Sequence, residues 1–226
     1  MPPRMLFRMN TVRIPAVSPR HDGEREPDLT SMYVIHRAML TDLRRITEVL
    51  GGKDPLTGGR NEAVRAYAGS VLTEVHHHHA NEDDLLWPII ERTAGHAVDL
   101  DPYTDDHQAL GPVLDRCRAA LRGDRQVLRR CLAELTDFLD EHIAEEESDL
   151  FPIITRFVPY DAYAWTERQV ARRASFGQLV FTAPWLLRHA TQEEGRRLLA
   201  GAGAPLRILL ALTRGRYARH ERAAFG

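Results

Sequence analysis

One motif occurs twice in the chain, as HHANEDDLLWPII at residues 78–90 and as HIAEEESDLFPII at residues 142–154. The two copies lie 64 residues apart and agree at seven of 13 positions. Each copy has a histidine followed four residues later by a glutamate, and residues four apart project from one face of a helix. We therefore expect each copy to direct one imidazole and one carboxylate toward a common point. The two pairs are His78 with Glu82 and His142 with Glu146.

Around the two copies, apolar residues recur at steps of three and four over residues 29–50, 61–91, 103–121 and 125–154. This spacing is typical of helices that bury one narrow face. Short loops between such helices indicate antiparallel neighbours, and no stretch alternates in the manner of a β-strand. The sequence predicts an all-α protein, an up-down-up-down four-helix bundle with additional C-terminal helices.

Histidines and glutamates occupy positions on the faces that these four helices are expected to bury. A single histidine there is more often a hydrogen-bonded core residue than a ligand. A buried carboxylate, however, is costly unless it is paired or bound to a metal, and helical bundles build di-metal sites from inward-facing His and Glu side chains. The pattern therefore predicts a metal site inside the bundle. The predicted ligands are His36, His78, Glu82, His107, His142 and Glu146.

The first copy of the motif begins within a run of four histidines, residues 76–79, of which only His78 lies on the predicted buried face. His79 flanks that face and could be a further ligand or a hydrogen-bond partner. His76 and His77 are expected to point partly outward. The histidines that the pattern does not assign to the site are His21, His96, His189 and His220.

The six predicted ligands, together with Trp87-Pro88 and Phe151-Pro152 near the ends of the two copies, resemble the hemerythrin-like family (the HHE cation-binding domain). The resemblance covers about residues 29–157. It implies a four-helix bundle around a non-haem di-iron centre, whose two iron ions are joined by two carboxylates and an oxo or hydroxo group. By this resemblance, Glu82 and Glu146 would be the bridging carboxylates, and the four histidines would be terminal ligands.

The chain departs from the oxygen-carrying members of that family at two positions. Those carriers have a second histidine one turn after the first on the third helix, where this chain has Gly111, and an aspartate where it has Glu146. Two octahedral irons offer about 12 positions, of which four imidazoles, two bridging carboxylates and one bridging oxygen fill about 10. About two positions therefore stay open. Water, peroxide or nitric oxide could bind there, unless His79, Tyr67 or Tyr103 fills one of them.

The 226 residues suit one large domain with an appended segment. We expect residues 1–27, which contain five prolines, to form a disordered or extended arm. Residues 28–157 are expected to form the bundle, and residues 158–226 a helical extension that packs on it.

Within the extension, Thr191 with Glu194 fits the capping box of a helix that ends near Gly201. The apolar residues among positions 179–187 could cover the bundle or form a homodimer contact. The extension is rich in arginine, which indicates a solvated face packing on the acidic bundle or, alternatively, a regulatory or partner-binding surface.

The composition excludes several function classes. The net charge is −2, so a dedicated nucleic-acid binder is not expected. No apolar run approaches the roughly 18 residues that span a bilayer, and no secretory signal is apparent. The two cysteines rule out a disulfide framework, and Cys117 is expected to be a small buried hydrophobe, too far from His107 to ligate the same metal. These observations favour a cytoplasmic protein.

Three functions fit this pattern, because mixed imidazole and carboxylate ligands suit iron, manganese or zinc. The first is a protein with two non-haem iron ions that binds or reacts with dioxygen, hydrogen peroxide or nitric oxide, with catalase- or peroxidase-like activity as its enzymatic form. The second is an iron or oxygen sensor without turnover that signals through the C-terminal helices. The third is a structural bundle with a zinc-filled or empty site.

Overall fold

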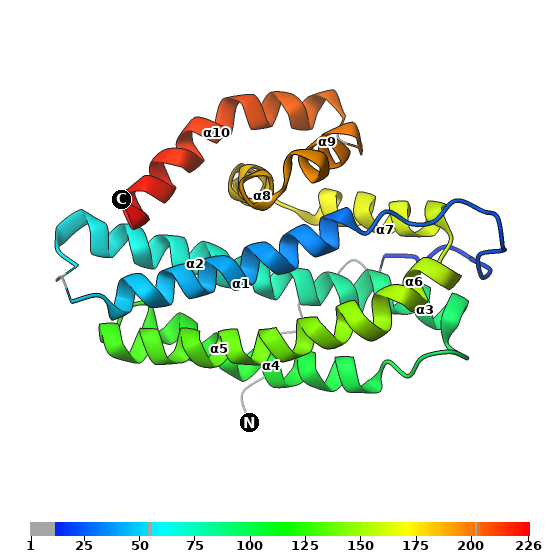
Figure 1. The fold of residues 1–226 in the computed structure, drawn as a ribbon, viewed down its shortest axis with the longest axis horizontal. Helices are drawn as coiled ribbons and strands as arrows, with labels where there is room; N and C mark the ends of the chain where they lie inside the picture. Colours follow the sequence, from blue (N-terminus) through cyan, green and yellow to red (C-terminus); the bar gives the residue numbers. More distant parts are fainter. Residues whose placement is uncertain (1–11, 54–55, 202) are drawn as a thin grey trace.

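The structure is a computed structural model that describes residues 12–53, 56–201 and 203–226, and all regular secondary structure in these ranges is helical (Figure 1). The predicted all-α fold is confirmed. Residues 1–11 of the predicted arm, and the loop residues Asp54 and Pro55, lie outside the described residues. Residues 12–27 of the arm contain no helix, and Arg20 in this segment donates its backbone N–H to the carbonyl of Phe157 at 2.7 Å.

Four long helices form the bundle, and each one matches a predicted segment. They are α1 (Thr30–Gly51), α2 (Gly58–Asn81), α4 (Asp101–Ala120) and α5 (Arg125–Glu145). Asp124 caps α5, since its side chain accepts hydrogen bonds from the backbone N–H groups of Gln126 and Val127 at 2.8 and 3.1 Å. The short turn at Gly123 and Asp124 joins α4 to α5, and the two helices pack against each other as antiparallel neighbours, as the sequence predicts.

The second and fourth helices do not continue as regular α-helices through the motif. Each changes into one π-helical turn and then into a short α-helix: α2 into η1 (Glu82–Leu86) and α3 (Trp87–Ala94), and α5 into η2 (Glu146–Leu150) and α6 (Phe151–Phe157). The physical reason is the proline of each motif copy, Pro88 or Pro152. A proline ring clashes with the carbonyl four residues earlier in an α-helix and has no N–H to donate. A wider turn before the proline relieves both conflicts.

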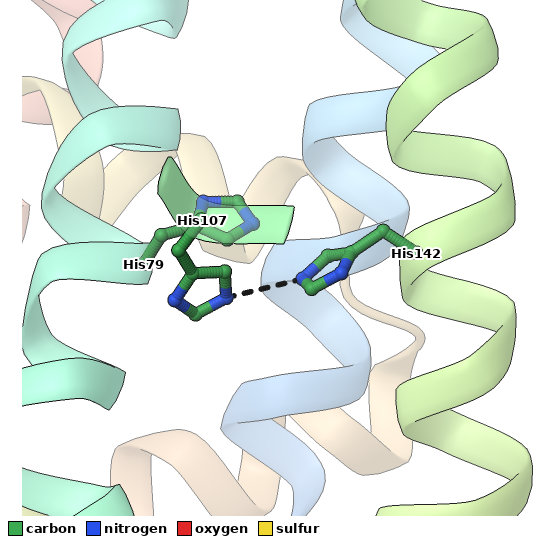
Figure 2. A group of neighbouring side chains, drawn as sticks. All are labelled: His79, His107 and His142. Carbon is green, nitrogen blue, oxygen red and sulfur yellow. Dashed lines mark hydrogen bonds between the residues drawn. The ribbon is translucent and has the colours of Figure 1, made fainter. Parts of the chain in front are cut away.

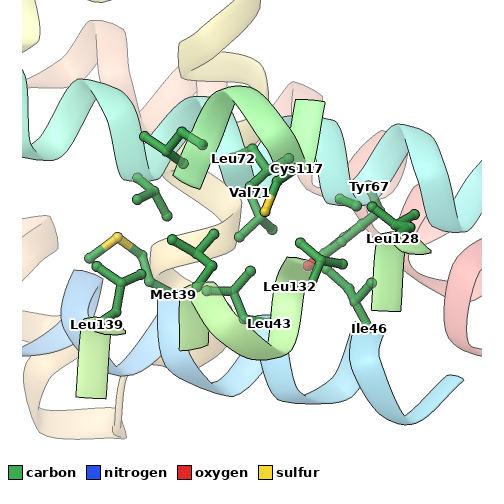
Figure 3. Close-up of a cluster of buried hydrophobic side chains, with 14 of the residues drawn as sticks. Met39, Leu43, Ile46, Tyr67, Val71, Leu72, Cys117, Leu128, Leu132 and Leu139 are labelled. Carbon is green, nitrogen blue, oxygen red and sulfur yellow. The ribbon is translucent and has the colours of Figure 1, made fainter. Parts of the chain in front are cut away.

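The apolar side chains of the bundle form two clusters, with a polar layer between them. The first cluster fills the bundle around Met39, Val71 and Leu132 (Figure 3), and Cys117 is fully buried in it as expected. The second cluster surrounds Trp87 and Phe151. Along α2 and η1, Val75 belongs to the first cluster and Leu86 to the second. His78 and Glu82 lie between them, so the metal-type side chains are confined to one layer.

The C-terminal extension consists of α7 (Tyr160–Arg173), α8 (Phe176–His189), α9 (Gln192–Gly201) and α10 (Ala204–Phe225). It lies over the side of the bundle formed by α1 and α2, and α8 and α10 pack directly on those helices (Figure 1). The predicted capping box before α9 is present, because Thr191 and Glu194 exchange hydrogen bonds of 2.7 and 3.3 Å. In the described part of the chain, no helix combines the length and apolarity needed to cross a membrane.

A buried aspartate fastens the extension to the bundle. Asp42 on α1 is fully buried, and its Oδ2 accepts hydrogen bonds from Tyr67 at 2.6 Å, from the indole of Trp185 at 2.8 Å and from His189 at 3.2 Å. Arg45 adds an ion pair to Oδ1 at 2.8 Å. The sequence pattern left His189 without a role, and the structure gives it one in this network.

Candidate metal centre

The polar layer brings together all six residues that the sequence predicts as ligands, and it adds His79. The donor atoms fall into two groups, and within each group they lie within 4.8 Å of one another. Figure 2 shows the second group, in which α2, α4 and α5 each contribute one imidazole. The first group is His36, His78, Glu82 and Glu146, and the second is His79, His107 and His142.

Each glutamate reaches both groups. Glu146 is fully buried, with Oε2 3.5 Å from Nε2 of His36 and Oε1 3.3 Å from Nε2 of His142. Glu82 places Oε1 3.2 Å from Nε2 of His78 and Oε2 3.9 Å from Nε2 of His107. A carboxylate whose two oxygens face two different donor groups has the arrangement needed to bridge two metal ions. Both glutamates are the first residues of their π turns, so the repeat extends to the backbone geometry.

Most of the imidazoles are held by their Nδ1 atoms. His107 donates from Nδ1 to Asp83 at 2.7 Å, and His142 donates to Asp106 at 3.2 Å. The remaining Nδ1 contacts are those of His36 with Glu147 at 3.0 Å and of His79 with the Val75 carbonyl at 2.7 Å. A carbonyl oxygen can only accept, so Nδ1 of His79 carries the proton and Nε2 presents a lone pair. Such contacts orient metal-ligating histidines and fix their tautomer.

Several inward atoms of the layer have no hydrogen bond within the protein. The buried side-chain atoms without a hydrogen bond include both oxygens of Glu82, both oxygens of Glu146 and Nε2 of His79. Such orphaned atoms are rare in folded proteins and require an explanation. A metal ion supplies one, because it satisfies carboxylate and imidazole lone pairs together.

The spacing of the imidazole nitrogens also suits a metal. Nε2 of His36 lies 2.9 Å from Nε2 of His78, and Nε2 of His107 lies 3.2 Å from Nε2 of His142. Two nitrogens bound to one ion at about 2.1 Å and at right angles lie about 3.0 Å apart. Without an ion, one nitrogen of each pair must carry a proton to avoid two facing lone pairs. The residues present therefore fit a pair of metal ions.

The electrostatics of the layer favour neutral His78 and His79, whereas attraction by Glu146 and Asp106 outweighs burial and raises the pKa of His142. Burial lowers the pKa of His78 well below its usual range, and burial together with His107 lowers the pKa of His79 to about 3. Burial and the charge of Glu146 raise the pKa of Glu82 well above its usual range. Burial alone would also raise the pKa of Glu146, but attraction by the neighbouring histidines, above all His142, outweighs it, so that this pKa falls. Neutral imidazoles and a carboxylate are the forms that bind metal.

The structure indicates which residue could act as the additional ligand, given that Gly111 stands where the carriers have a histidine. Tyr67 is engaged by Asp42, and Tyr103 packs its ring against Trp87 with centroids 6.2 Å apart. His79, in contrast, is 3% exposed and belongs to the second donor group. A Cβ at Gly111 would meet nothing within 4 Å, so packing does not demand glycine there. Of the three candidates that the sequence left open, His79 has the geometry of a ligand.

Comparison with protein families identifies the bundle. The model of the hemerythrin HHE cation binding domain matches residues 28–154, more than half of the chain, and the chain belongs to this family. The buried His and Glu cluster lies within the matched residues and fits the metal-binding site that such a domain implies. Comparison with curated proteins and with solved structures gives no match.

Proposed function

We propose that the polar layer holds two non-haem iron ions, joined by an oxo or hydroxo bridge, at which dioxygen, hydrogen peroxide or nitric oxide binds or reacts. One observation carries the proposal. Glu82 and Glu146 each face both donor groups, and none of their four carboxylate oxygens accepts a hydrogen bond. The proposed terminal ligands are His36, His78, His79, His107 and His142.

In this proposal, the number of donors in each group bears on where an open coordination position would lie. Two octahedral ions offer about 12 positions, of which five imidazoles, two bridging carboxylates and one bridging oxygen fill about 11. His79 would thus take the place of the third-helix histidine that this chain lacks at Gly111. The second group has three imidazoles and the first only two, so an ion held by His36 and His78 would have the position that stays open.

Bound iron would supply one-electron redox chemistry toward these small oxidants. The protein side chains contribute three effects. The carboxylates of Asp83 and Asp106 and the Val75 carbonyl orient the imidazoles. The apolar clusters on either side exclude bulk water from the layer. Glu82, whose pKa is raised, releases its proton when it becomes a ligand, which makes binding tighter as the pH rises.

Metal content and an optical spectrum test the proposal. The protein should be purified without nickel affinity chromatography, since residues 76–79 could retain nickel. We expect about two irons per chain and near-ultraviolet charge-transfer bands that respond to azide or peroxide. Less than about half an iron per chain would contradict the proposal. Glu146→Ala should lose both signals, and Glu141→Ala, an exposed glutamate on the same helix, should keep them.

A sensor without turnover is the second candidate, and contacts of the extension with the first motif copy and the histidine before it favour it. Arg173 of α7 pairs with Asp84 of the π turn at 2.8 Å, and Gln178 of α8 contacts His77. A structural change caused by loss of the metal could therefore be transmitted to the extension through η1. In the sensor, limited proteolysis of residues 158–226 should change with metal while peroxide is not consumed. Steady oxygen release from peroxide that Glu146→Ala abolishes would instead indicate a catalase-like enzyme.

A cytoplasmic location and a homodimer through the C-terminal helices stay predictions. Cys117 and Cys131 are both free thiols, which suits a reducing compartment. Ile208 and Leu212 on α10 are 61% and 76% exposed, and a second copy could cover them. Sedimentation at several concentrations would test the homodimer.

A further inference from the structure

A cavity of about 540 Å³ lies between the bundle and its extension. Helices α1, α2 and the π turn η1 form one wall, and α7 to α10 form the other. His78 and Glu82, both from the first donor group, contribute to the bundle wall. The cavity therefore borders the side of the centre on which we place the open position. Small-molecule sites in proteins typically enclose about 300–1,000 Å³.

The wall supplied by the extension is apolar. Leu186 and Leu187 of α8 and Leu198 and Leu199 of α9 line the cavity and remain half-buried. Helix α9 has no fully buried residue, although its apolar residues lie on one face. A helix that serves only to cover a bundle buries its apolar face against it. Here that face is turned toward space that a small molecule can fill.

Glu74 is a deeply buried polar group of the cavity that lies outside the metal layer. Glu74 on α2 is 5% exposed and lies one helical turn before His78. Burial raises the pKa of Glu74 to about 7, although a hydrogen bond with Thr182 opposes the rise. The carboxyl group can thus donate a hydrogen bond as an acid, and the hydroxyl of Thr182 is beside it.

The charges around the cavity disfavour an anion. Its arginine, Arg173, is already paired with Asp84. The extension wall contributes one acidic lining residue, Glu167, which accepts a hydrogen bond from Ser31 at 2.8 Å and whose pKa burial raises. An anionic head group would meet carboxyl groups instead of an unpaired cation among the described lining residues. A neutral ligand avoids this repulsion.

We propose that this cavity binds one neutral aliphatic molecule with a single hydroxyl or carbonyl end, and that this polar end lies against Glu74 and Thr182. The aliphatic chain contacts the leucines of α8 and α9. The ligand then lies beside His78 and Glu82, so the position of the site next to a metal centre rests on the proposed function. The binding itself does not, because the extension wall and Glu74 are independent of the metal.

Binding of octan-1-ol to the full chain, measured by titration calorimetry, tests the site. We expect one saturable site per chain. Ala183→Trp places a large ring in the cavity from α8 and should weaken binding at least tenfold, and the milder Ala183→Leu should weaken it about threefold. Ala119→Trp, on an exposed position of α4 away from the cavity, is the matched control. Unchanged affinity in a folded Ala183 variant, or no saturable binding, would overturn the proposal; if Ala183→Trp does not fold, Ala183→Leu decides.

The ligand class is tested by a matched series of octan-1-ol, octanoate and octylammonium. The alcohol should bind tightest, and a preference for either ion would refute the neutral class. Glu74→Gln should keep alcohol affinity and Glu74→Leu should reduce it about fivefold, since a buried hydrogen bond is lost. Iron content is measured on the same samples. Alcohol binding without iron would contradict only the proposed function, and iron without alcohol binding would contradict only this inference.

Discussion

Two sets of buried carboxylates in the bundle differ in how their oxygens are satisfied. Asp42 accepts hydrogen bonds from Tyr67, Trp185 and His189 and pairs with Arg45. Glu82 and Glu146 are buried to a similar extent, yet none of their four oxygens has a hydrogen-bond partner. Burial is therefore common to a structural carboxylate and to a candidate ligand.

What separates the two sets is the supply of donors within the protein. The Asp42 network is complete without any added group, and the hydrogen bonds from its neighbours lower its pKa to about 2 despite burial, which acts in the opposite direction. The polar layer is incomplete, because its imidazole nitrogens and carboxylate oxygens face one another. A search for metal sites in such bundles should thus look for buried carboxylates without donors, since buried carboxylates alone are ambiguous.

The strongest test of this comparison removes one orphaned carboxylate. Glu146→Gln should lower iron content from about two per chain to below about 0.2, because an amide cannot bridge two ions as a carboxylate does. Asp42→Asn should leave the iron content unchanged. Elemental analysis of both variants checks the difference. Equal loss of iron in the two variants would show that the comparison is wrong.

The second test removes the satisfied carboxylate. Asp42→Ala should lower the free energy of unfolding of the metal-free protein by about 3 kcal/mol, because Arg45 and the three hydrogen-bond donors lose their common partner. Chemical denaturation followed by circular dichroism measures this change. The metal-free Glu146→Ala variant serves as the comparison and should be destabilised less, because it loses the attraction of His142 and the packing of a buried side chain but no hydrogen bond.

The third test uses acid. The folded pKa of Asp42, about 2, lies below the value of about 3.9 in unfolded chains. Asp42 therefore contributes stability that is fully present above about pH 4 and is lost as the pH falls toward 2. The contribution is about 3 kcal/mol, and about half of it should be gone at pH 3. Denaturation of wild type and Asp42→Asn at pH 6 and pH 3 measures it, and a constant difference would contradict the lowered pKa.

The smallest effect is expected from a residue that only orients a ligand. Asp106→Ala removes the acceptor of the Nδ1 proton of His142 and should weaken iron affinity about tenfold while leaving the number of irons at saturation unchanged. Competition with a chelator of known affinity reports the change. Asp105→Ala, an exposed neighbour, should match the wild type.

The sequence was sufficient to predict the four bundle helices and the convergence of six metal-type side chains. Helical spacing fixes which residues share a face, so His36 and His107 could be assigned to the buried layer without any motif of their own. The duplication then linked the two His-x-x-x-Glu pairs. The assignment of these residues as ligands stays a prediction until metal is measured.

Other features depend on information that helical spacing does not contain. The π turns at Glu82 and Glu146 change the spacing itself, so the apolar pattern does not reveal them within the predicted helices of residues 61–91 and 125–154. His79 is one residue away from the expected face, so spacing alone left its role open. The Asp42 network and the cavity arise from packing between residues that are far apart in the chain. A local sequence pattern cannot predict which distant residues will be in contact.

The Asp42 network also has a consequence for the order in which the protein assembles during synthesis. Trp185 follows Asp42 by 143 residues. At about 5–20 residues per second, the ribosome needs roughly 10–30 s to add them. During this interval α1 and α2 can pair while Asp42 still lacks its indole partner. The face that the extension will cover is therefore the last to close, and a nascent chain is most vulnerable to misfolding there.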